Sequence, residues 1–212
     1  MKYLVKKIDD NLKTSIDEMQ FSEIESIHIN NYLWMNNNYN PNVEAKVCYS
    51  AKNIFVYFKV YEKEITATYT NINDPVYKNS CVEFFVNLFP EMTDKYFNFE
   101  MNAIGTIYVG FGAIGKRKIL PIEDIKLVKV FSTLTKPFVG QIENDFWEIK
   151  LSIPINLLEK YYKQKFESNP AIANFYKCGD ATKYEHYGCW NLINSEKPNF
   201  HLPKYFGDLL FE

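Results

Sequence analysis

Strict alternation of side-chain polarity over residues 77–112 constrains the fold of this chain more than any other feature. Three short runs, separated by turn-forming residues, carry an apolar side chain at nearly every second position. These positions are Val82, Phe84, Val86 and Leu88, then Phe97, Phe99, Met101 and Ala103, then Ile107, Val109 and Phe111. A period of two is typical of β-strands with one dry face. The stretch therefore predicts three consecutive strands joined by tight links.

The second face of these predicted strands combines carboxyl groups, amides and aromatic rings. Its members are Cys81, Glu83, Phe85 and Asn87, then Tyr96, Asn98, Glu100 and Asn102, then Thr106, Tyr108 and Gly110. Sugar rings stack on aromatic side chains, and their hydroxyl groups bind carboxylates and amides. The pattern is therefore compatible with a saccharide-binding surface, with Tyr77 and Trp190 available from loops. A solvated sheet face whose polar residues resist aggregation explains the same pattern.

The remainder of the chain predicts more strands and few helices. Further strands are expected at residues 3–8, 44–49, 54–61, 126–134, 146–152, 171–176 and 206–211. Residues 3–8 are expected at a sheet edge, and residues 54–61, apolar or aromatic on both faces, in the centre. Pro154 opens the one helix candidate, residues 155–166. Without alternation of helices and strands, the chain predicts an all-β fold, an antiparallel two-sheet β-sandwich with one short helix.

Composition limits the classes of partner. The 212 residues show no linker and no internal repeat, which predicts a single domain over residues 1–212. A net charge of -2 gives no basis for nucleic-acid binding. No signal peptide and no membrane-spanning run is present, so a cytoplasmic location without membrane contact is expected. The four scattered cysteines predict buried, reduced thiols and neither a zinc site nor a disulfide framework.

Catalytic chemistry has three candidate arrangements in the sequence. Glu83 and Glu100 on adjacent strands are a carboxyl pair of the kind used by glycoside hydrolases. The three histidines, His28, His186 and His201, show no metal-ligand spacing, although Cys178 or Cys189 near His186 is a formal nucleophile arrangement. The loop at residues 71–74 is compatible with calcium or with Asx-turns.

A protein-interaction domain is a further alternative. Trp34, Tyr39 and Phe200 lie in loops, and together they would form an apolar patch if all three were exposed. The oligomeric state is not predicted.

Several stretches together resemble the carbohydrate-binding family 9-like proteins, which are related to the DOMON-like β-sandwiches. They are VYKNSCVEFFVN, YFNFEMNAIGTIYVGFG, WEIKLSIPINLL, ANFYKCGD and PNFHLPKYFGDLLF. The resemblance covers most of the chain from about Phe21 onward. It implies a jelly-roll-like sandwich that recognises a saccharide without catalysis.

The resemblance also implies roles for particular residues. In such modules two tryptophans sandwich a terminal sugar, while a glutamate and an asparagine on neighbouring strands bind its hydroxyls. Tyr77, six residues before Glu83, matches one stacking ring, and Trp190 is the best match for the other. Asn102 matches the strand asparagine, and Glu100 stands where those modules carry an arginine. No catalytic residue is therefore expected, and no cofactor except a structural calcium, which maps onto no particular residue.

Overall fold

The computed structural model describes residues 1–9, 15–168 and 170–212. Within this described part the regular secondary structure consists almost entirely of short strands. In chain order they are β1 (Lys2–Lys7), β2 (Ile27–His28), β3 (Asn31–Tyr32), β4 (Asn42–Tyr49), β5 (Asn53–Tyr61), β6 (Glu64–Ala67), β7 (Cys81–Asn87), β8 (Tyr96–Asn102), β9 (Ile107–Gly112), β10 (Lys118–Ile119), β11 (Lys129–Ser132), β12 (Phe138–Gln141), β13 (Trp147–Pro154), β14 (Ala171–Cys178), β15 (Tyr187–Cys189) and β16 (Gly207–Phe211). The all-β prediction is confirmed.

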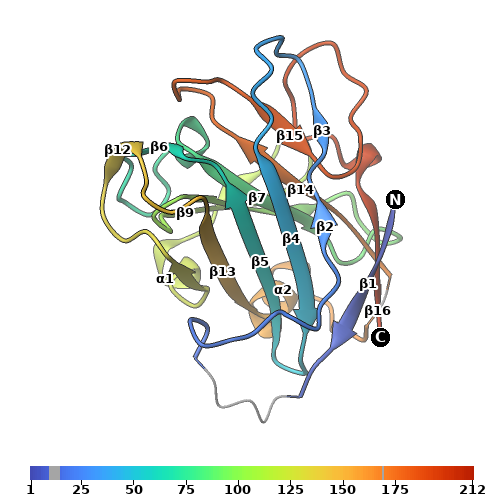
Figure 1. Cartoon of the computed structure of the whole chain (residues 1–212). Coiled ribbons are helices and arrows are strands. Elements are labelled where there is room, and N and C mark those ends of the chain that lie inside the picture. Colours follow the sequence, from blue (N-terminus) through green and yellow to red (C-terminus); the bar gives the residue numbers. More distant parts are fainter. Residues whose placement is uncertain (10–14, 169) are drawn as a thin grey trace.

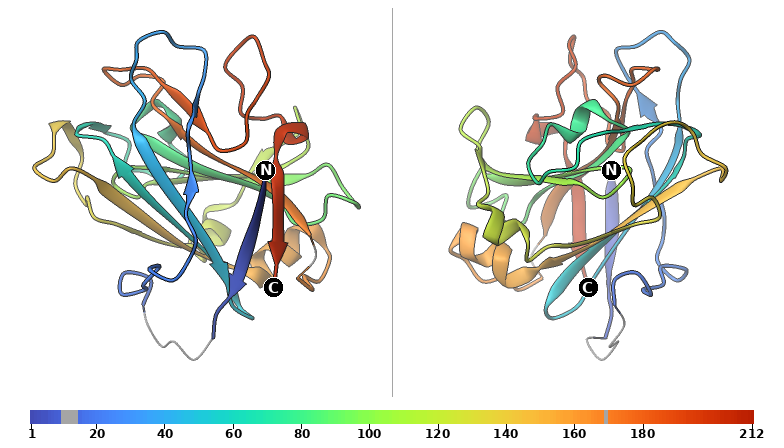
Figure 2. Two further views of the ribbon diagram at one scale, coloured as in Figure 1. Left: turned by 45° about the vertical axis from the view of Figure 1, so that its right-hand side comes forward. Right: turned by 90° about the vertical axis from the view of Figure 1, so that its left-hand side faces the viewer.

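The strands form two packed layers that are continuous at one side. The order along the curled sheet is β10-β9-β8-β7-β14-β16-β1-β4-β5-β13-β11, and β6 pairs with β12 separately. One layer consists of β10, β9, β8, β7, β14 and β16, and the other consists of β4, β5, β13 and β11, as Figures 1 and 2 show from three directions. The three consecutive strands predicted over residues 77–112 are confirmed as the antiparallel β7, β8 and β9.

Strand β1 departs from the predicted antiparallel sandwich. It pairs in parallel with β16 through residues 2–5 and in parallel with β4 through Lys6 and Lys7. The sheet is therefore mixed, and its two layers are joined through β1, which is not an edge strand. The edge position expected for residues 3–8 is therefore wrong. The three lysines of β1 are exposed, while Tyr3 and Val5 are buried.

Both layers contribute to one main hydrophobic core. The apolar rows of β7 and β8 face the inner rows of β5 and β13, and β5 lies between β4 and β13 as expected for a central strand. Trp147 of β13 and Phe58 of β5 are fully buried there.

The outer face of β7, β8 and β14 is covered as well, which makes it unlike a solvated sheet face. Side chains from this face pack with the C-terminal segment in a second hydrophobic cluster. The buried members are Val76, Cys81, Phe85, Tyr96, Tyr176, Cys178, Cys189, Ile193, Phe200 and Phe206.

The described residues contain two α-helices, α1 (Ile122–Ile125) and α2 (Ile155–Tyr162), where one was predicted. Helix α2 begins directly after Pro154, as expected, but ends four residues before the predicted boundary. Lys163 adopts a left-handed conformation with φ of 55°, which terminates the helix. Two 3-10 turns, η1 (Val76–Lys78) and η2 (Pro203–Tyr205), lie near the site described below. Among the described residues, no helix is both long and apolar enough to span a membrane.

Candidate functional site

A cavity of about 540 Å³ lies on the outer face of β7, β8 and β14. Strands form its floor, while η1, the link between β9 and β10 and the C-terminal loop form its walls. Its lining residues are Asn73, Pro75, Tyr77, Glu83, Glu100, Tyr108, Arg117, Cys178, Asp180, Tyr187, Pro198, Asn199, Phe200 and His201. The volume falls within the roughly 300–1,000 Å³ typical of small-ligand sites.

A row of four side chains crosses the cavity floor at one register position. Strand pairing places Tyr176 opposite Glu83, Glu83 opposite Glu100, and Glu100 opposite Tyr108. Side chains directly opposite on antiparallel strands lie on the same face, with their Cβ atoms about 5 Å apart. The sequence pattern thus brings two carboxyl groups together under the cavity, and both are almost completely buried.

Burial governs the protonation of these carboxyl groups. It raises the pKa of Glu83 well above its ordinary value, and the Cys178 thiol and Glu100 carboxyl raise it further. Burial also raises the pKa of Glu100, although the hydrogen bond from Asn98 and the charge of Arg117 oppose the rise. At the cavity wall, burial raises the pKa of Asp180 to about 6. The floor therefore holds bound protons near neutral pH and can both donate and accept hydrogen bonds.

Arg117 is held over the floor by the carboxamide of Asn98. Arg117 Nη1 donates to Asn98 Oδ1 at 2.8 Å, and Asn98 Nδ2 donates to Glu100 Oε1 at 2.9 Å. Asn98 lies opposite Gly110 on β9, where a Cβ atom would come within 2.6 Å of Asn98 Oδ1. The glycine therefore gives the carboxamide the space in which it joins a carboxyl group to a guanidinium.

Aromatic rings border the cavity on two sides. Tyr77 in η1 is 38% exposed and presents its ring to solvent. On the other side, Phe200 stacks on Tyr176 with centroids 4.1 Å apart, and His201 stacks on Phe85 at 4.9 Å. Burial and the nearby Arg117 lower the pKa of His201 to about 3, so its ring is neutral.

Three of the five predicted site residues line this cavity, namely Tyr77, Glu83 and Glu100. Asn102 does not. It is fully buried and organises the chain around it, because its Nδ2 donates to Tyr69 O and its Oδ1 accepts from Thr106 N.

Trp190 also lies away from the cavity. Its ring packs edge-on against Phe175 in the main core and is 6% exposed, so neither face is open for stacking. The structure therefore does not bring the second predicted stacking ring to the site. Trp190 has no predictable position in the sequence, because a long loop fixes neither the direction nor the depth of its side chains.

Sequence reasoning missed several residues of the cavity, above all Arg117, Asp180 and His201. Arg117 lies between two lysines in a short basic run, Lys116–Lys118, which has no strand or helix periodicity, and the pairing of β9 with β10 brings it to the floor. Asp180 follows β14 within a stretch that the family resemblance already included, which was the available signal. Glu148 and Lys150 are the polar residues of the strand predicted over residues 146–152, and they resemble the polar face of residues 77–112 in character, but they lie on β13 in the other layer.

The sequence offers two other candidate arrangements: a cysteine nucleophile near His186 and a calcium-binding loop at residues 71–74. Cys178 Sγ donates to Glu83, whereas His186 Nε2 lies 2.6 Å from Lys177 Nζ, so cysteine and histidine form no catalytic pair. In the loop at residues 71–74, Asp74 Oδ2 accepts from the backbone N–H groups of Thr70 and Asn71, four and three residues earlier, so this carboxylate is bonded within its own loop.

The predicted apolar patch is not formed by its three proposed members. Trp34 packs against Phe200 at 5.9 Å, while Tyr39 stacks on Tyr184 and bonds to Glu62. Phe200 is 9% exposed.

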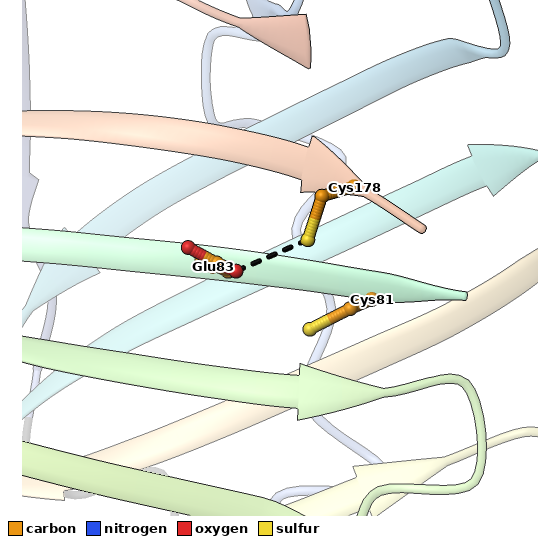
Figure 3. Close-up of side chains that lie close together, drawn as sticks. All are labelled: Cys81, Glu83 and Cys178. Carbon is orange, nitrogen blue, oxygen red and sulfur yellow. Dashed lines mark hydrogen bonds between the residues drawn. The ribbon is translucent and has the colours of Figure 1, made fainter. Parts of the chain in front are cut away.

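One group of potential metal ligands occurs among the described residues. Cys81, Glu83 and Cys178 place their ligand atoms within 4.8 Å of one another, and Figure 3 shows the three side chains close together on β7 and β14. All four cysteines are free and buried, as predicted.

Comparisons with known proteins agree with this architecture. A protein from Bacteroides uniformis, provisionally described as carbohydrate-binding, has a crystal structure that matches with a TM-score of 0.89 and 30% identity, covering 100% of this chain and 99% of that one. Two structures of a family 9 carbohydrate-binding module from Caldicellulosiruptor kristjanssonii, in complex with glucose and with cellotriose, match at 12% identity. Their TM-scores are 0.63 and 0.62, over 100% of this chain and 96% and 94% of those chains.

Comparison with curated protein sequences finds no match. The family model described as "Carbohydrate-binding family 9" matches residues 14–211. The chain belongs to carbohydrate-binding family 9.

Proposed function

We propose that the protein binds a saccharide in the cavity above Glu83 and Glu100 without cleaving it. The observation that carries this proposal is the combination of an exposed ring with buried hydrogen-bonding groups in one cavity. Family membership supports it, and so do the glucose and cellotriose in the complexes of the similar modules.

Each group at the cavity has a distinct role in this proposal. The Tyr77 ring stacks on the C–H face of a sugar, because it is the exposed ring beside the floor. Glu83 and Glu100 bind hydroxyl groups, and their raised pKa values allow each to donate as well as accept. Phe200 and His201 close the opposite wall, where apolar contact excludes water.

Arg117 provides the cavity with a guanidinium from a different position in the chain than the family resemblance implies. The family resemblance expects an arginine at the position of Glu100, and this chain has a carboxyl group there. Arg117 reaches the same floor from the link between β9 and β10, held by Asn98. We propose that it donates to sugar hydroxyls, so that the site keeps a guanidinium with different strand connectivity.

Isothermal titration with glucose, cellotriose and a wider glycan panel tests this function. Tyr77→Ala, Glu100→Gln and Arg117→Ala should each weaken binding by roughly tenfold or more, the effect of losing a stacking ring or a charged hydrogen bond. Tyr61→Ala is the matched control, since Tyr61 is 36% exposed but lies on β5 in the other layer. No binding by any saccharide, or equal losses for Tyr61→Ala and Tyr77→Ala, would contradict the proposal.

Recognition of a chain-terminal sugar is the finer form of this proposal. If only one sugar residue of a saccharide enters the cavity, the affinity for cellotriose should differ little from the affinity for glucose. A steep rise in affinity with chain length would instead indicate several subsites along the surface.

A glycan-acting hydrolase is the second candidate, favoured by the in-register carboxyl pair with raised pKa values. Product analysis after incubation with the bound glycan separates the two functions. If the wild-type protein releases shorter sugars and the Glu83→Gln variant does not, the hydrolase is favoured.

A further inference from the structure

We propose that Cys81, Glu83 and Cys178 form a site for a thiophilic divalent cation, with Zn²⁺ as the best-suited ion. The inference rests on the position of these three side chains (Figure 3) and not on saccharide binding, although Glu83 is also one of the groups proposed above to bind sugar hydroxyls. It differs from the calcium expected in this family, because two of the three donors are sulfur atoms.

Strand geometry brings the three ligands together. Cys81 and Glu83 are two residues apart on β7, so their side chains lie on one face, and Cys178 on β14 is directly opposite Cys81. Cys178 Sγ is 3.1 Å from Glu83 Oε1, and all three ligand atoms lie within 4.8 Å. Zinc–sulfur bonds of about 2.3 Å and zinc–oxygen bonds of about 2.1 Å separate neighbouring ligands by roughly 3.5 Å. Small side-chain rotations therefore suffice to bind one ion.

The chemistry of the cluster is otherwise unexplained by the fold. Within the described part of the chain, the one side-chain hydrogen-bond donor to the buried Glu83 carboxyl is the Cys178 thiol, and a thiol is a weak donor. Burying a carboxyl group with so weak a partner is unfavourable. A cation between the carboxylate and the two sulfur atoms would compensate for this cost.

Binding exchanges protons for the ion. Burial raises the pKa values of both thiols and of Glu83, which favours the protonated form of each group when no ion is bound. Coordination releases the two thiol protons and the carboxyl proton to solvent, leaving a complex of one divalent ion with two thiolates and one carboxylate. Arg117 lines the same cavity and favours the remaining negative charge.

The ion has a route to the site, because Glu83 and Cys178 both line the cavity. Three protein ligands leave a tetrahedral ion with a fourth position for water or another oxygen donor. Two sulfur ligands favour zinc, cadmium or cobalt over calcium and magnesium, which prefer oxygen.

Cobalt titration of the full chain, metal-free and kept reduced with a phosphine, tests the proposal. We expect one equivalent of Co²⁺ to produce sulfur-to-cobalt charge-transfer absorption, and Zn²⁺ to abolish it. Cys81→Ser and Cys178→Ser should each weaken binding at least tenfold. Cys48→Ser and Cys189→Ser are matched controls, because both cysteines are buried outside the cluster, and they should retain the absorption.

A second measurement applies if the serine variants fail to fold. In the wild-type protein, Zn²⁺ should slow alkylation of Cys81 and Cys178 by iodoacetamide, measured by peptide mass spectrometry, and leave Cys48 unaffected. Absence of charge-transfer absorption, an unchanged titration in folded Cys178→Ser, or alkylation insensitive to zinc would each overturn the proposal. Tyr77→Ala should keep the cobalt absorption while losing saccharide affinity, so failure of this site and failure of saccharide binding are distinguishable.

Discussion

At the scale of single residues, the site depends on how Asn98 is placed. Its carboxamide is the link between Glu100 on the same strand and Arg117 on the neighbouring turn. This link requires a glycine opposite, since the Cβ of any other residue at position 110 would lie 2.6 Å from Asn98 Oδ1. A glycine in a strand is usually unfavourable, because it adds conformational freedom to the unfolded chain. Here the glycine leaves the space that the Asn98 carboxamide occupies beneath the cavity.

Gly110→Ala tests this arrangement. Alanine in a strand would ordinarily stabilise the fold by roughly 0.5–1 kcal/mol. We expect the opposite sign, a loss of about 1–3 kcal/mol in the free energy of unfolding, because the Asn98 carboxamide must move. Saccharide affinity should fall as well, since Arg117 loses its hydrogen-bond acceptor.

Urea denaturation of the double-mutant cycle with Asn98→Ala measures this interaction. In the Asn98→Ala background the added methyl group meets no carboxamide, so Gly110→Ala should cost at least about 1 kcal/mol less. Additive effects of the two substitutions would show that the close approach is not the cause.

At the scale of elements, β14 carries a thiol on its outer face and a buried ammonium group on its inner face near residue 178. Cys178 points to the cavity, while Lys177 points inward between the layers and is fully buried. The Lys177 ammonium is 3.1 Å from Glu62, which follows β5 in the opposite layer, and 2.6 Å from His186 Nε2. Burial and the adjacent Lys177 lower the pKa of His186 to about 2, so the histidine is neutral and accepts from the lysine. This buried ion pair joins the layers beneath the cavity wall.

Lys177→Met should destabilise the protein by about 3–5 kcal/mol, because the Glu62 carboxylate would be buried without its counterion. Adding Glu62→Gln should recover a large part of that loss, since glutamine carries no charge and still accepts from Trp147 Nε1. Guanidinium denaturation at neutral pH measures both variants.

Lys183→Met provides the control for this comparison. Lys183 forms an exposed pair with Glu64, and such pairs contribute little. The free energy of unfolding should remain nearly unchanged. If Lys177→Met proves equally mild, the buried pair does not hold the layers together.

At the scale of the whole molecule, β1 closes the fold. It lies beside β16, so the first and last strands of the chain are neighbours, as Figure 1 shows. Its last two paired residues then join β4 in the other layer. The two ends of the chain together therefore make one layer continuous with the other.

Val5→Asp should show how much stability this closure provides. Val5 is 0% exposed, so a carboxylate there is buried between the layers, and we expect a loss on the order of 4 kcal/mol or more. Leu4→Asp changes the adjacent position on the outer face, which is 52% exposed, and should alter stability by less than about 0.5 kcal/mol. Thermal unfolding followed by circular dichroism distinguishes the two. Equal effects would mean that β1 is not an internal strand.

The strands of the site could be predicted because their side chains alternate strictly. Val82, Phe84 and Val86 could only face a core, and the same alternation placed Glu83 and Glu100 together on the other face. Trp190 and Arg117 could not be placed in this way. Their positions depend on loop paths and on pairing between β9 and β10, which leave no periodic signal in the sequence.

The sequence by itself determined the all-β class, the triple strand of residues 77–112 and the polar row that became the cavity floor. These features follow from local alternation, which a strand converts directly into two faces. Only the tertiary structure decided that β1 joins both layers in parallel, that the C-terminal loop buries the outer face, and that Cys178 meets Cys81 and Glu83. Each of these contacts joins segments far apart in the chain. Their formation depends on the burial and hydrogen bonding of the whole molecule, not on the preference of any one segment.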